Sequence, residues 1–307
     1  MKLAFVFPGQ GSQSIGMMQG FADLSVVRDT FAEAGDVLKQ DIWAMVSDGP
    51  QDVINQTVNT QPIMLCAGVA VYRAWLEVGG QQPGFMAGHS LGEYTALVAS
   101  GALSFADALP LVRYRAIAMQ DAVAEGSGAM AAILGLGDDA VRAACAEAAQ
   151  GEVLEAVNFN SPGQVVIAGN KAAVERGMEA AKARGAKRAL PLPVSVPSHC
   201  ALMKPAAEKL AAYLQDVKMQ TPAIPVLHNA DVRSYSQASE IKDALARQLY
   251  QPVRWVETVQ ALAAAGVTQI AECGPGKVLA GLNKRIVSDM LSIALTDAAA
   301  LQQLKNS

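Results

Sequence analysis

Residues 85–94 read FMAGHSLGEY, and this stretch predicts the structure of the chain around it. An apolar run enters Gly88-His89-Ser90-Leu91-Gly92, and the residues that follow have helical spacing. The pattern G-x-S-x-G between a strand and a helix is typical of a nucleophile elbow, a strained turn that exposes the serine hydroxyl. The two glycines leave room where strand and helix cross. We therefore predict that Ser90 is a nucleophile; the alternative is a glycine-rich turn in which Ser90 caps the helix.

The overall composition is that of an ordinary globular protein with one large domain or two. The chain has 307 residues, of which 51% are hydrophobic and 17% charged, so it can bury a large core. Its net charge of -4 argues against a general binder of nucleic acids or anionic membranes. No apolar run approaches the roughly 20 residues of a membrane span, and LAFVF after Lys2 is too short for a signal peptide. We expect a cytoplasmic protein.

The cysteines Cys66, Cys145, Cys200 and Cys273 are widely separated and form no C-x-x-C pair. This spacing argues against a zinc site and indicates reduced thiols. We expect no bound metal.

Strands and helices alternate along most of the chain. A strand over 3–7 opens into Pro8-Gly9-Gln10-Gly11, whose glycines fit neither a P-loop nor G-x-G-x-x-G. This loop could still expose backbone N–H groups at the carboxyl end of a strand, where open α/β sheets bind ligands; a plain turn is the alternative. Further helices are expected over 21–38, 62–78 (with Pro62 in its first turn), 105–123, 201–215, 241–249 and 256–265, and strands over 224–227 and 269–272.

The region between residues 126 and 196 has a different order of elements, β-α-β-β-α-β. Strands are expected over 129–136, 153–159, 164–168 and 189–194, and helices over 138–150 and 171–184. This order is typical of the ferredoxin-like unit, and glycines and prolines bound it on either side. We predict an inserted subdomain over 126–196 in a main domain formed by 1–125 and 197–307.

A serine nucleophile needs a base, and the chain has three histidines. His89 precedes Ser90, and the chain reversal should point these neighbouring side chains in different directions. His228 ends an apolar strand and could reach the edge of the sheet. His199 lies where the inserted unit rejoins the main domain, and ligands usually bind in a cleft between two such parts. We favour His199, although a structural role is the general alternative for any single histidine.

Two arginines, Arg113 and Arg115, lie on the helix expected over 105–123. Residues two positions apart on a helix are separated by about 200° around its axis, so these two side chains cannot both face one site. We expect one of them to be solvated.

Further motifs follow one another along nearly the whole chain. They are FVFPGQGSQ at 5–13, GHSLGEY at 88–94, R-x-x-x-M-Q at 115–120, VNFNSPGQVVIAG at 157–169, LPVSVPSHCALM at 192–203, QLYQPVRW at 248–255 and GPGKVL at 274–279. In this order they resemble the malonyl-CoA:acyl carrier protein transacylases of bacterial fatty-acid synthesis. The resemblance implies an α/β fold, with an α/β-hydrolase-like parallel-sheet core that carries an inserted ferredoxin-like subdomain.

The resemblance also implies roles for individual residues. Ser90 would be the nucleophile and His199 its base, oriented by the backbone carbonyl of Gln248 instead of a carboxylate. Arg115, and not Arg113, would pair with the free carboxylate of the substrate. Further substrate contacts would come from Gln10 and Leu91, whose backbone N–H groups would form the oxyanion hole, and from Met119 and Asn160.

The implied reaction is transfer of the malonyl group from malonyl-CoA, through a malonyl-serine, to the phosphopantetheine thiol of holo acyl carrier protein. It needs no tightly bound cofactor. Lys187 and Arg188 could contact coenzyme A or the acidic carrier protein, and two solvated side chains are the alternative. We expect no nucleic-acid or membrane partner and, because no coiled coil or symmetric motif is visible, a monomer.

Other classes of protein remain possible at this point. A hydrolase would share the serine and histidine but would not need the buried arginine. A related acyltransferase of polyketide synthesis or malonate metabolism would differ in its carrier protein. A non-catalytic interaction protein would not depend on Ser90.

Overall fold

A parallel sheet forms around β1 (Leu3–Phe7), whose apolar side chains are buried on both faces. The strand order is β7-β2-β1-β8-β9, and every adjacent pair is parallel. β2 (Phe85–Gly88) and β8 (Gln269–Cys273) flank β1, and β7 (Val226–Leu227) and β9 (Leu291–Leu295) form the edges. This sheet confirms the expected α/β-hydrolase-like core.

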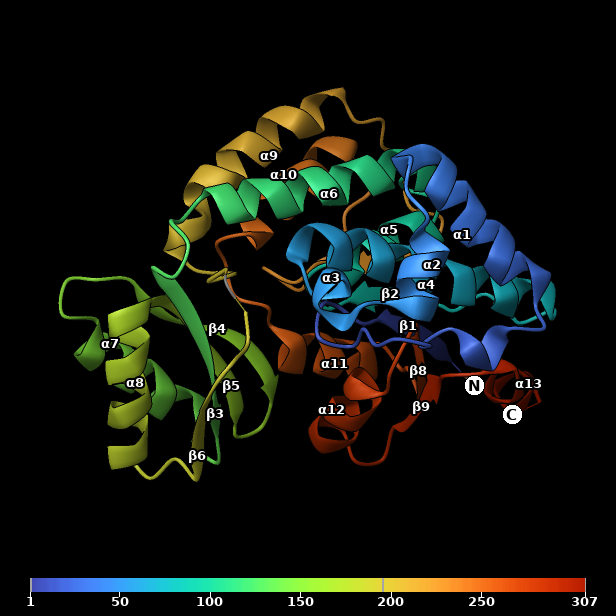
Figure 1. Ribbon diagram of the computed structural model, residues 1–307. Helices are drawn as coiled ribbons and strands as arrows, with labels where there is room; N and C mark the ends of the chain where they lie inside the picture. Colours follow the sequence, from blue (N-terminus) through green and yellow to red (C-terminus); the bar gives the residue numbers. More distant parts are fainter. Residues whose placement is uncertain (1, 195, 307) are drawn as a thin grey trace.

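Helices cover both faces of this sheet (Figure 1). Phe5 and Phe7 belong to the core on one face, whereas Ala4 and Val6 pack with Trp255 on the other. The helices of this lobe are α1 (Ser25–Leu38), α2 (Ile42–Asp48), α3 (Gln51–Ile54), α4 (Thr57–Glu77), α5 (Gly92–Ala99), α6 (Phe105–Asp121), α9 (Lys204–Asp216), α10 (Ala238–Gln248), α11 (Trp255–Ala264), α12 (Val278–Ile286) and α13 (Ala298–Lys305), with 3-10 turns at Gln19–Phe21 and Ala201–Met203.

The smaller lobe contains an antiparallel sheet of order β4-β5-β3-β6. Its elements are β3 (Gly128–Leu134), α7 (Asp138–Ala149), β4 (Leu154–Ser161), β5 (Gln164–Asn170), α8 (Lys171–Ala183) and β6 (Arg188–Pro191). Side chains of both helices pack on this sheet in a hydrophobic core of their own. The order and pairing confirm the ferredoxin-like insert, while the exact domain boundaries at 126 and 196 remain our proposal.

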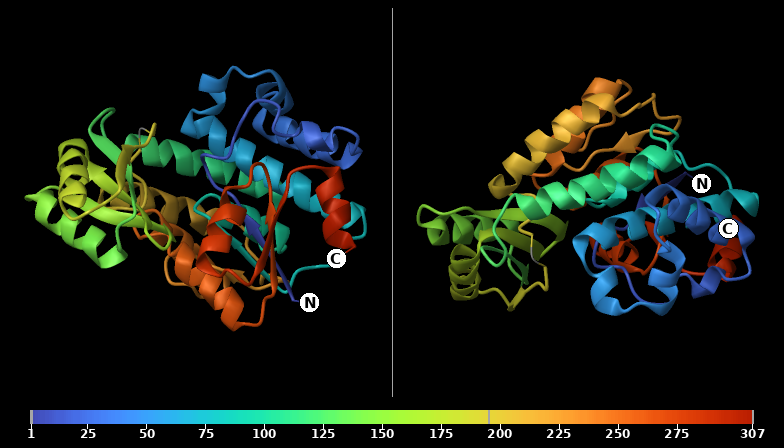
Figure 2. Two further views of the ribbon diagram at one scale, coloured as in Figure 1. Left: turned by 90° about the horizontal axis from the view of Figure 1, so that it is seen from below. Right: turned by 45° about the horizontal axis from the view of Figure 1, so that its top comes forward.

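The two lobes are joined through β4. The backbone N–H of Phe159 donates to the carbonyl of Val253 at 3.0 Å, and the N–H of Val253 donates to the carbonyl of Val157 at 2.8 Å. Figure 2 shows both chain ends on the side of the molecule away from the small lobe. The computed structural model describes residues 2–194 and 196–306, so the predicted domain ends at 1 and 307 lie outside the described residues. Within these ranges no helix is long and apolar enough to cross a membrane.

Several predicted boundaries are wrong. α4 begins at Thr57, so Pro62 lies inside the helix and not in its first turn. An interior proline costs about 3 kcal/mol in an exposed helix, but here nearly every side chain from Thr60 to Tyr72 is buried, and this packing outweighs the cost. α1 begins at Ser25 instead of residue 21, and β6 ends at Pro191 instead of residue 194. The short helices α2 and α3, and the elements β9, α12 and α13, were not predicted from the sequence.

Candidate active site

Ser90 lies on a tight turn between β2 and α5, and its φ of 51° is in the left-handed region. A Cβ atom on Gly88 would lie 1.9 Å from the carbonyl carbon of Gly92. One on Gly92 would lie 2.0 Å from the carbonyl oxygen of Phe7. Only glycine fits at both positions, which is the geometric requirement of a nucleophile elbow.

The imidazole of His199 contacts the Ser90 hydroxyl. Nε2 of His199 lies 2.8 Å from Oγ of Ser90, and Nδ1 lies 2.7 Å from the backbone oxygen of Gln248. Because a carbonyl only accepts, Nδ1 carries the proton, and Nε2 is left to accept the proton of Ser90. His199 itself has a left-handed φ of 68° and is fixed by its N–H, which donates to the carbonyl of Leu249 at 2.9 Å.

The surroundings of His199 keep it neutral. The side chain is 2% exposed, and burial, together with the positive charge of Arg115, lowers its pKa to about 3. The hydrogen bond to the carbonyl of Gln248 opposes this shift but does not cancel it. At neutral pH the imidazole is therefore unprotonated, which leaves Nε2 available as a hydrogen-bond acceptor.

Arg115 extends from α6 into the same site, and only 1% of it is exposed. Its Nη2 donates to Oγ of Ser90 at 3.1 Å and to Oε1 of Gln248 at 2.9 Å, and Nη1 donates to Oε1 of Gln61 at 2.9 Å. Arg113 points elsewhere, since it donates to the carbonyl of Leu38 and to Gln40, and it is half-buried instead of fully solvated. Among the described residues Arg115 forms no ion pair, so a substrate carboxylate would find a guanidinium beside Ser90 that no protein carboxylate contacts.

Two backbone donors lie on the loops that follow β1 and β2. These strands pair in register from Ala4 to Phe7, so the loops begin next to each other. The N–H groups of Gln10 and Leu91 donate to no other group in the described part of the chain. This is the condition that an oxyanion hole requires, and that role for the two residues stays a prediction.

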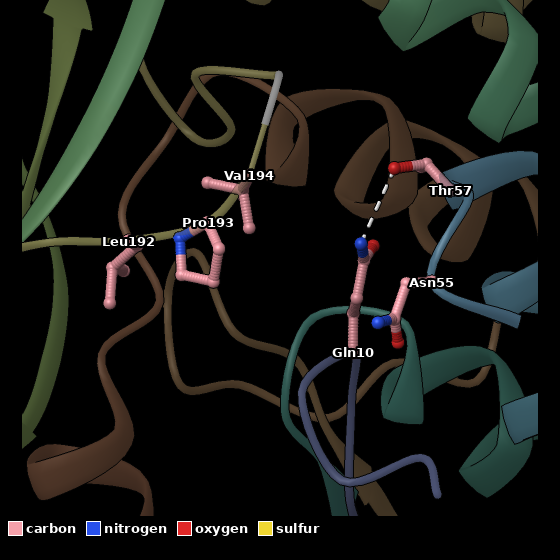
Figure 3. Close-up of a pocket in the computed structure, with 6 residues that line it drawn as sticks. All are labelled: Gln10, Asn55, Thr57, Leu192, Pro193 and Val194. Atoms are coloured by element: carbon pink, nitrogen blue, oxygen red, sulfur yellow. Dashed lines mark hydrogen bonds between the residues drawn. The ribbon is translucent and has the colours of Figure 1, made fainter. Parts of the chain in front are cut away.

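A cavity of about 360 Å³ opens beside the first of these loops (Figure 3). It is lined by Gln10, Asn55, Thr57, Leu192, Pro193 and Val194. One wall is polar and comes from the large lobe, where Nε2 of Gln10 donates to Oγ1 of Thr57 at 3.3 Å. The opposite wall, residues 192–194, is the apolar segment that follows β6. The cavity thus lies between the large lobe and the chain that returns from the small one.

Of the other predicted contact residues, Met119 and Asn160 lie near the site, whereas Lys187 and Arg188 do not. Met119 is buried, and its Sδ accepts from Gln61 at 3.8 Å, which places it next to Arg115. Asn160 accepts at 2.8 Å from Nε2 of His89, so it connects β4 with the Ser90 turn. Lys187 and Arg188 are exposed at the start of β6, whereas the cavity is lined by residues beyond the other end of that strand. The structure does not bring these two side chains to the cavity.

Three polar residues of the site were missed in the sequence, namely Gln61, Glu93 and Asn229. Glu93 lies in the elbow motif itself, and Asn229 follows His228 at the end of β7. His228 does not reach Ser90, because its Nδ1 donates to Oε1 of Glu93 at 2.7 Å. No sequence signal singled out Gln61, because α4 has other polar residues such as Asn59 and Thr60 close to it.

No metal site was found in the ranges that the structure describes, where no three His, Cys, Asp or Glu side chains lie close enough to hold an ion. The four cysteines are buried free thiols.

Comparisons with known proteins agree with this geometry. The model of the acyl transferase domain family matches residues 4–296. The malonyl CoA-acyl carrier protein transacylase of Escherichia coli (strain K12) is 56% identical over 301 residues, which cover 98% of this chain and 97% of that protein. Among solved structures, the acyl-carrier-protein S-malonyltransferase of Burkholderia pseudomallei 1710b is 60% identical with a TM-score of 0.99, and 100% of each chain is covered.

A second solved structure contains a partner. It is a type II PKS acyl-carrier protein in complex with its malonyl-transacylase, which is 54% identical to this chain with a TM-score of 0.98 and covers 100% of this chain and 99% of its own. The chain therefore belongs to the acyl transferase domain family, among the malonyl CoA-acyl carrier protein transacylases.

Proposed function

We propose that the protein transfers the malonyl group from malonyl-CoA to the phosphopantetheine thiol of an acyl carrier protein through a malonyl ester on Ser90. The observation that carries this proposal is the pair of contacts at Oγ of Ser90, 2.8 Å to Nε2 of His199 and 3.1 Å to Nη2 of Arg115. A base and a buried cation beside one nucleophile suit an acyl group that ends in a carboxylate.

In the first half-reaction His199 accepts the proton of Ser90 while Oγ attacks the thioester carbon of malonyl-CoA. The N–H groups of Gln10 and Leu91 donate to the developing oxyanion. The C–S bond then breaks, and the imidazolium returns its proton to the sulfur, so that coenzyme A leaves as a thiol. Arg115 pairs with the malonyl carboxylate and orients the ester.

The second half-reaction reverses these roles. His199 accepts the proton of the phosphopantetheine thiol, and the sulfur attacks the carbonyl carbon of the malonyl ester. The bond to Oγ breaks, Ser90 recovers the proton, and malonyl-carrier protein leaves. Because both thiols react at one serine, the kinetics are ping-pong.

The cavity beside Gln10 is the proposed path for the phosphopantetheine arm. Its polar wall offers side-chain amides and a hydroxyl for the amide groups of the arm, and Leu192, Pro193 and Val194 offer an apolar wall for its methyl groups. Coenzyme A and the carrier protein carry the same arm, so one path serves both half-reactions.

The identity of the carrier is the remaining choice. Fatty-acid synthesis is our proposal, while the similarity to a transacylase solved with a type II PKS acyl-carrier protein favours a polyketide carrier as the second candidate. Measuring kcat/KM for one carrier of each kind separates the two candidates.

Free thiols at four buried cysteines are typical of a reducing compartment and support the cytoplasm as the place of action.

The test is to mix the protein with malonyl-CoA and holo acyl carrier protein and to follow the mass of the carrier. We expect a malonyl adduct on the carrier, much less of an acetyl adduct from acetyl-CoA, and neither adduct with Ser90→Ala. Release of free malonate with an unmodified carrier would show a hydrolase instead.

A further inference from the structure

A buried carboxylate lies behind the reacting groups. Glu93, in the first turn of α5, is 0% exposed, and its Oε1 accepts from Nδ1 of His228 at 2.7 Å. Its Oε2 accepts from the backbone N–H of Asn229 at 2.8 Å and from Nε2 of Gln248 at 3.0 Å. A buried carboxylate persists only when donors surround it, and these three donors and the helix N-terminus stabilise its charge.

One of these donors connects Glu93 with the nucleophile. The side chain of Asn229 accepts from the backbone N–H of Ser90 at 2.7 Å and donates to the carbonyl of Gly88 at 2.6 Å. Asn229 therefore holds the part of the strained turn that leads into the left-handed Ser90. Such a conformation costs about 1–3 kcal/mol and persists when the surrounding contacts enforce it. Asn229 is itself held by Glu93.

Gln248 connects Glu93 with Arg115 and with Ser90. Its Oε1 accepts from Arg115, while its Nε2 donates to Oε2 of Glu93 and to the carbonyl of Ser90 at 3.0 Å. Arginine only donates and an ionised carboxylate only accepts, so the two neighbours leave a single possible orientation for the amide. The same residue orients His199 through its backbone oxygen.

The charge of Glu93 also acts on Arg115. Burial lowers the pKa of Arg115, and Tyr94 and Glu93 oppose this shift. Because the amide of Gln248 stands between them, Glu93 balances the guanidinium without forming an ion pair with it. A carboxylate substrate therefore does not have to displace a protein carboxylate.

We propose that Glu93 is a positioning residue that acts through Asn229 on Ser90 and through Gln248 on Arg115, and that it thereby sets the preference for acyl donors with a free carboxylate. The inference rests on the proposed function. It assigns a role to a residue that does not touch the substrate.

The first test compares Glu93→Gln with the unaltered protein in single-turnover acylation by malonyl-CoA and by acetyl-CoA. A glutamine keeps the shape but removes the charge, and its NH₂ group meets at least one of the three donors. We expect malonyl transfer to fall about 100-fold and acetyl transfer about 10-fold, because a lost hydrogen bond to a charged group typically costs about a factor of 10 to 100.

Glu272→Gln is the matched control. Glu272 is also 0% exposed, lies at the end of β8, and takes no part in the proposed reaction. We expect this variant to keep the malonyl-to-acetyl ratio of the unaltered protein.

A second pair of variants keeps the proposal testable if Glu93→Gln does not fold. His228→Asn places an amide N–H where Nδ1 donates to Glu93, whereas His228→Leu removes this donor. We expect the asparagine variant to keep the malonyl-to-acetyl ratio within about 2-fold and the leucine variant to lower it several-fold.

Equal losses for both acyl donors, or no loss for either, would overturn the proposal, since a merely structural glutamate changes the two rates together. Equal ratios in the two His228 variants would overturn it as well. A separate measurement distinguishes failure of the proposed function. If the unaltered protein forms no adduct with malonyl-CoA, yet Ser90 is acylated by p-nitrophenyl acetate, the proposed acyl donor is wrong. The positioning role is then judged from the rates at which the same variants react with p-nitrophenyl acetate. This rate should fall about 10-fold in Glu93→Gln and stay unchanged in Glu272→Gln.

Discussion

The turns after β2 and β8 lie on either side of β1 at the carboxyl edge of one sheet, and they differ in what surrounds them. Closely packed glycines occur at both turns, Gly88 and Gly92 at the first and Gly274 at the second, and a buried glutamate lies next to each turn. At the first turn Glu93 has three donors, which come from Asn229, Gln248 and His228. At the second, Oε2 of Glu272 accepts from the N–H of Ala280 at 2.8 Å, while Oε1 has no hydrogen-bond partner among the described residues.

The difference between the two turns lies in the side chains that reach them and not in the backbone alone. Both turns bend sharply, and Gly274 after β8 has a φ of 145° that glycine alone adopts easily. His199, Arg115 and Gln248 come from segments distant in sequence and converge only on the turn after β2. We therefore expect changes near β2 to alter chemistry and changes near β8 to alter stability.

Removing the base should have the largest effect. We expect His199→Ala to slow acylation of Ser90 by malonyl-CoA about 10³- to 10⁴-fold, because a positioned general base typically contributes up to about that factor. Stopped-flow release of coenzyme A measures this rate. A loss below about 10-fold would mean that another group accepts the proton of Ser90.

Removing the guanidinium should change the choice of acyl donor. We expect Arg115→Ala to lose malonyl transfer by about 10²- to 10³-fold while acetyl transfer gains relative to it, since one partner of a buried charge pair is missing. Arg115→Lys should also be impaired, because an ammonium group does not reproduce the bidentate fork. Competition between malonyl-CoA and acetyl-CoA gives the ratio directly, and an unchanged ratio in Arg115→Ala would refute the assigned role.

The turn after β8 should respond in stability. Burial raises the pKa of Glu272 to about 7, so the folded protein binds this proton more tightly than the unfolded chain does. The resulting stability is present below the unfolded pKa near 4.5 and is lost as the pH rises through 7. Over that range it amounts to about 3 kcal/mol.

Urea unfolding of Glu272→Gln at pH 5 and pH 8 tests this. The variant lacks the titrating group, so its unfolding free energy should fall less between the two pH values than that of the unaltered protein. The same fall in both proteins would contradict the raised pKa.

The smallest change is expected for the pH dependence of the acylation rate. With a pKa of about 3, His199 stays neutral throughout the mildly acidic range. We expect the single-turnover acylation rate to stay constant from pH 8 to pH 5, whereas a histidine of ordinary pKa would cause a roughly 30-fold fall at pH 5. A fall with its midpoint near pH 6.5 would show that His199 is protonated far more easily than its burial implies.

The sequence was sufficient to predict those parts of the site whose geometry depends on neighbouring residues. Gly88, Ser90 and Gly92 are fixed by the crossing of one strand and the next helix, so five consecutive residues contain the signal. The start of α6 also depends on a local contact, since Oγ of Ser104 accepts from the N–H of Asp107 and caps the helix. Periodicity was enough for the order of the elements in the small lobe, whereas in the large lobe it missed α2, α3, α12, β9 and α13.

The rest of the site depends on contacts between distant parts of the chain. Gln61 meets Arg115 across 54 residues, and Glu93 meets His228 across 135. No local pattern encodes such pairs. For the same reason the start of α4 was misplaced, since Pro62 is tolerated inside this helix only because the helix is buried by the core around it.

The most direct measurement is a chase of the isolated acyl-enzyme. The protein is incubated with malonyl-CoA, freed of coenzyme A and divided into two samples. One sample is digested for peptide mass analysis, and the other is mixed with holo acyl carrier protein. We expect a malonyl adduct on the peptide that contains Ser90, stable in buffer and moved to the carrier thiol on mixing. An absent adduct, or one that is lost to water at the same rate with and without the carrier, would contradict transfer through Ser90.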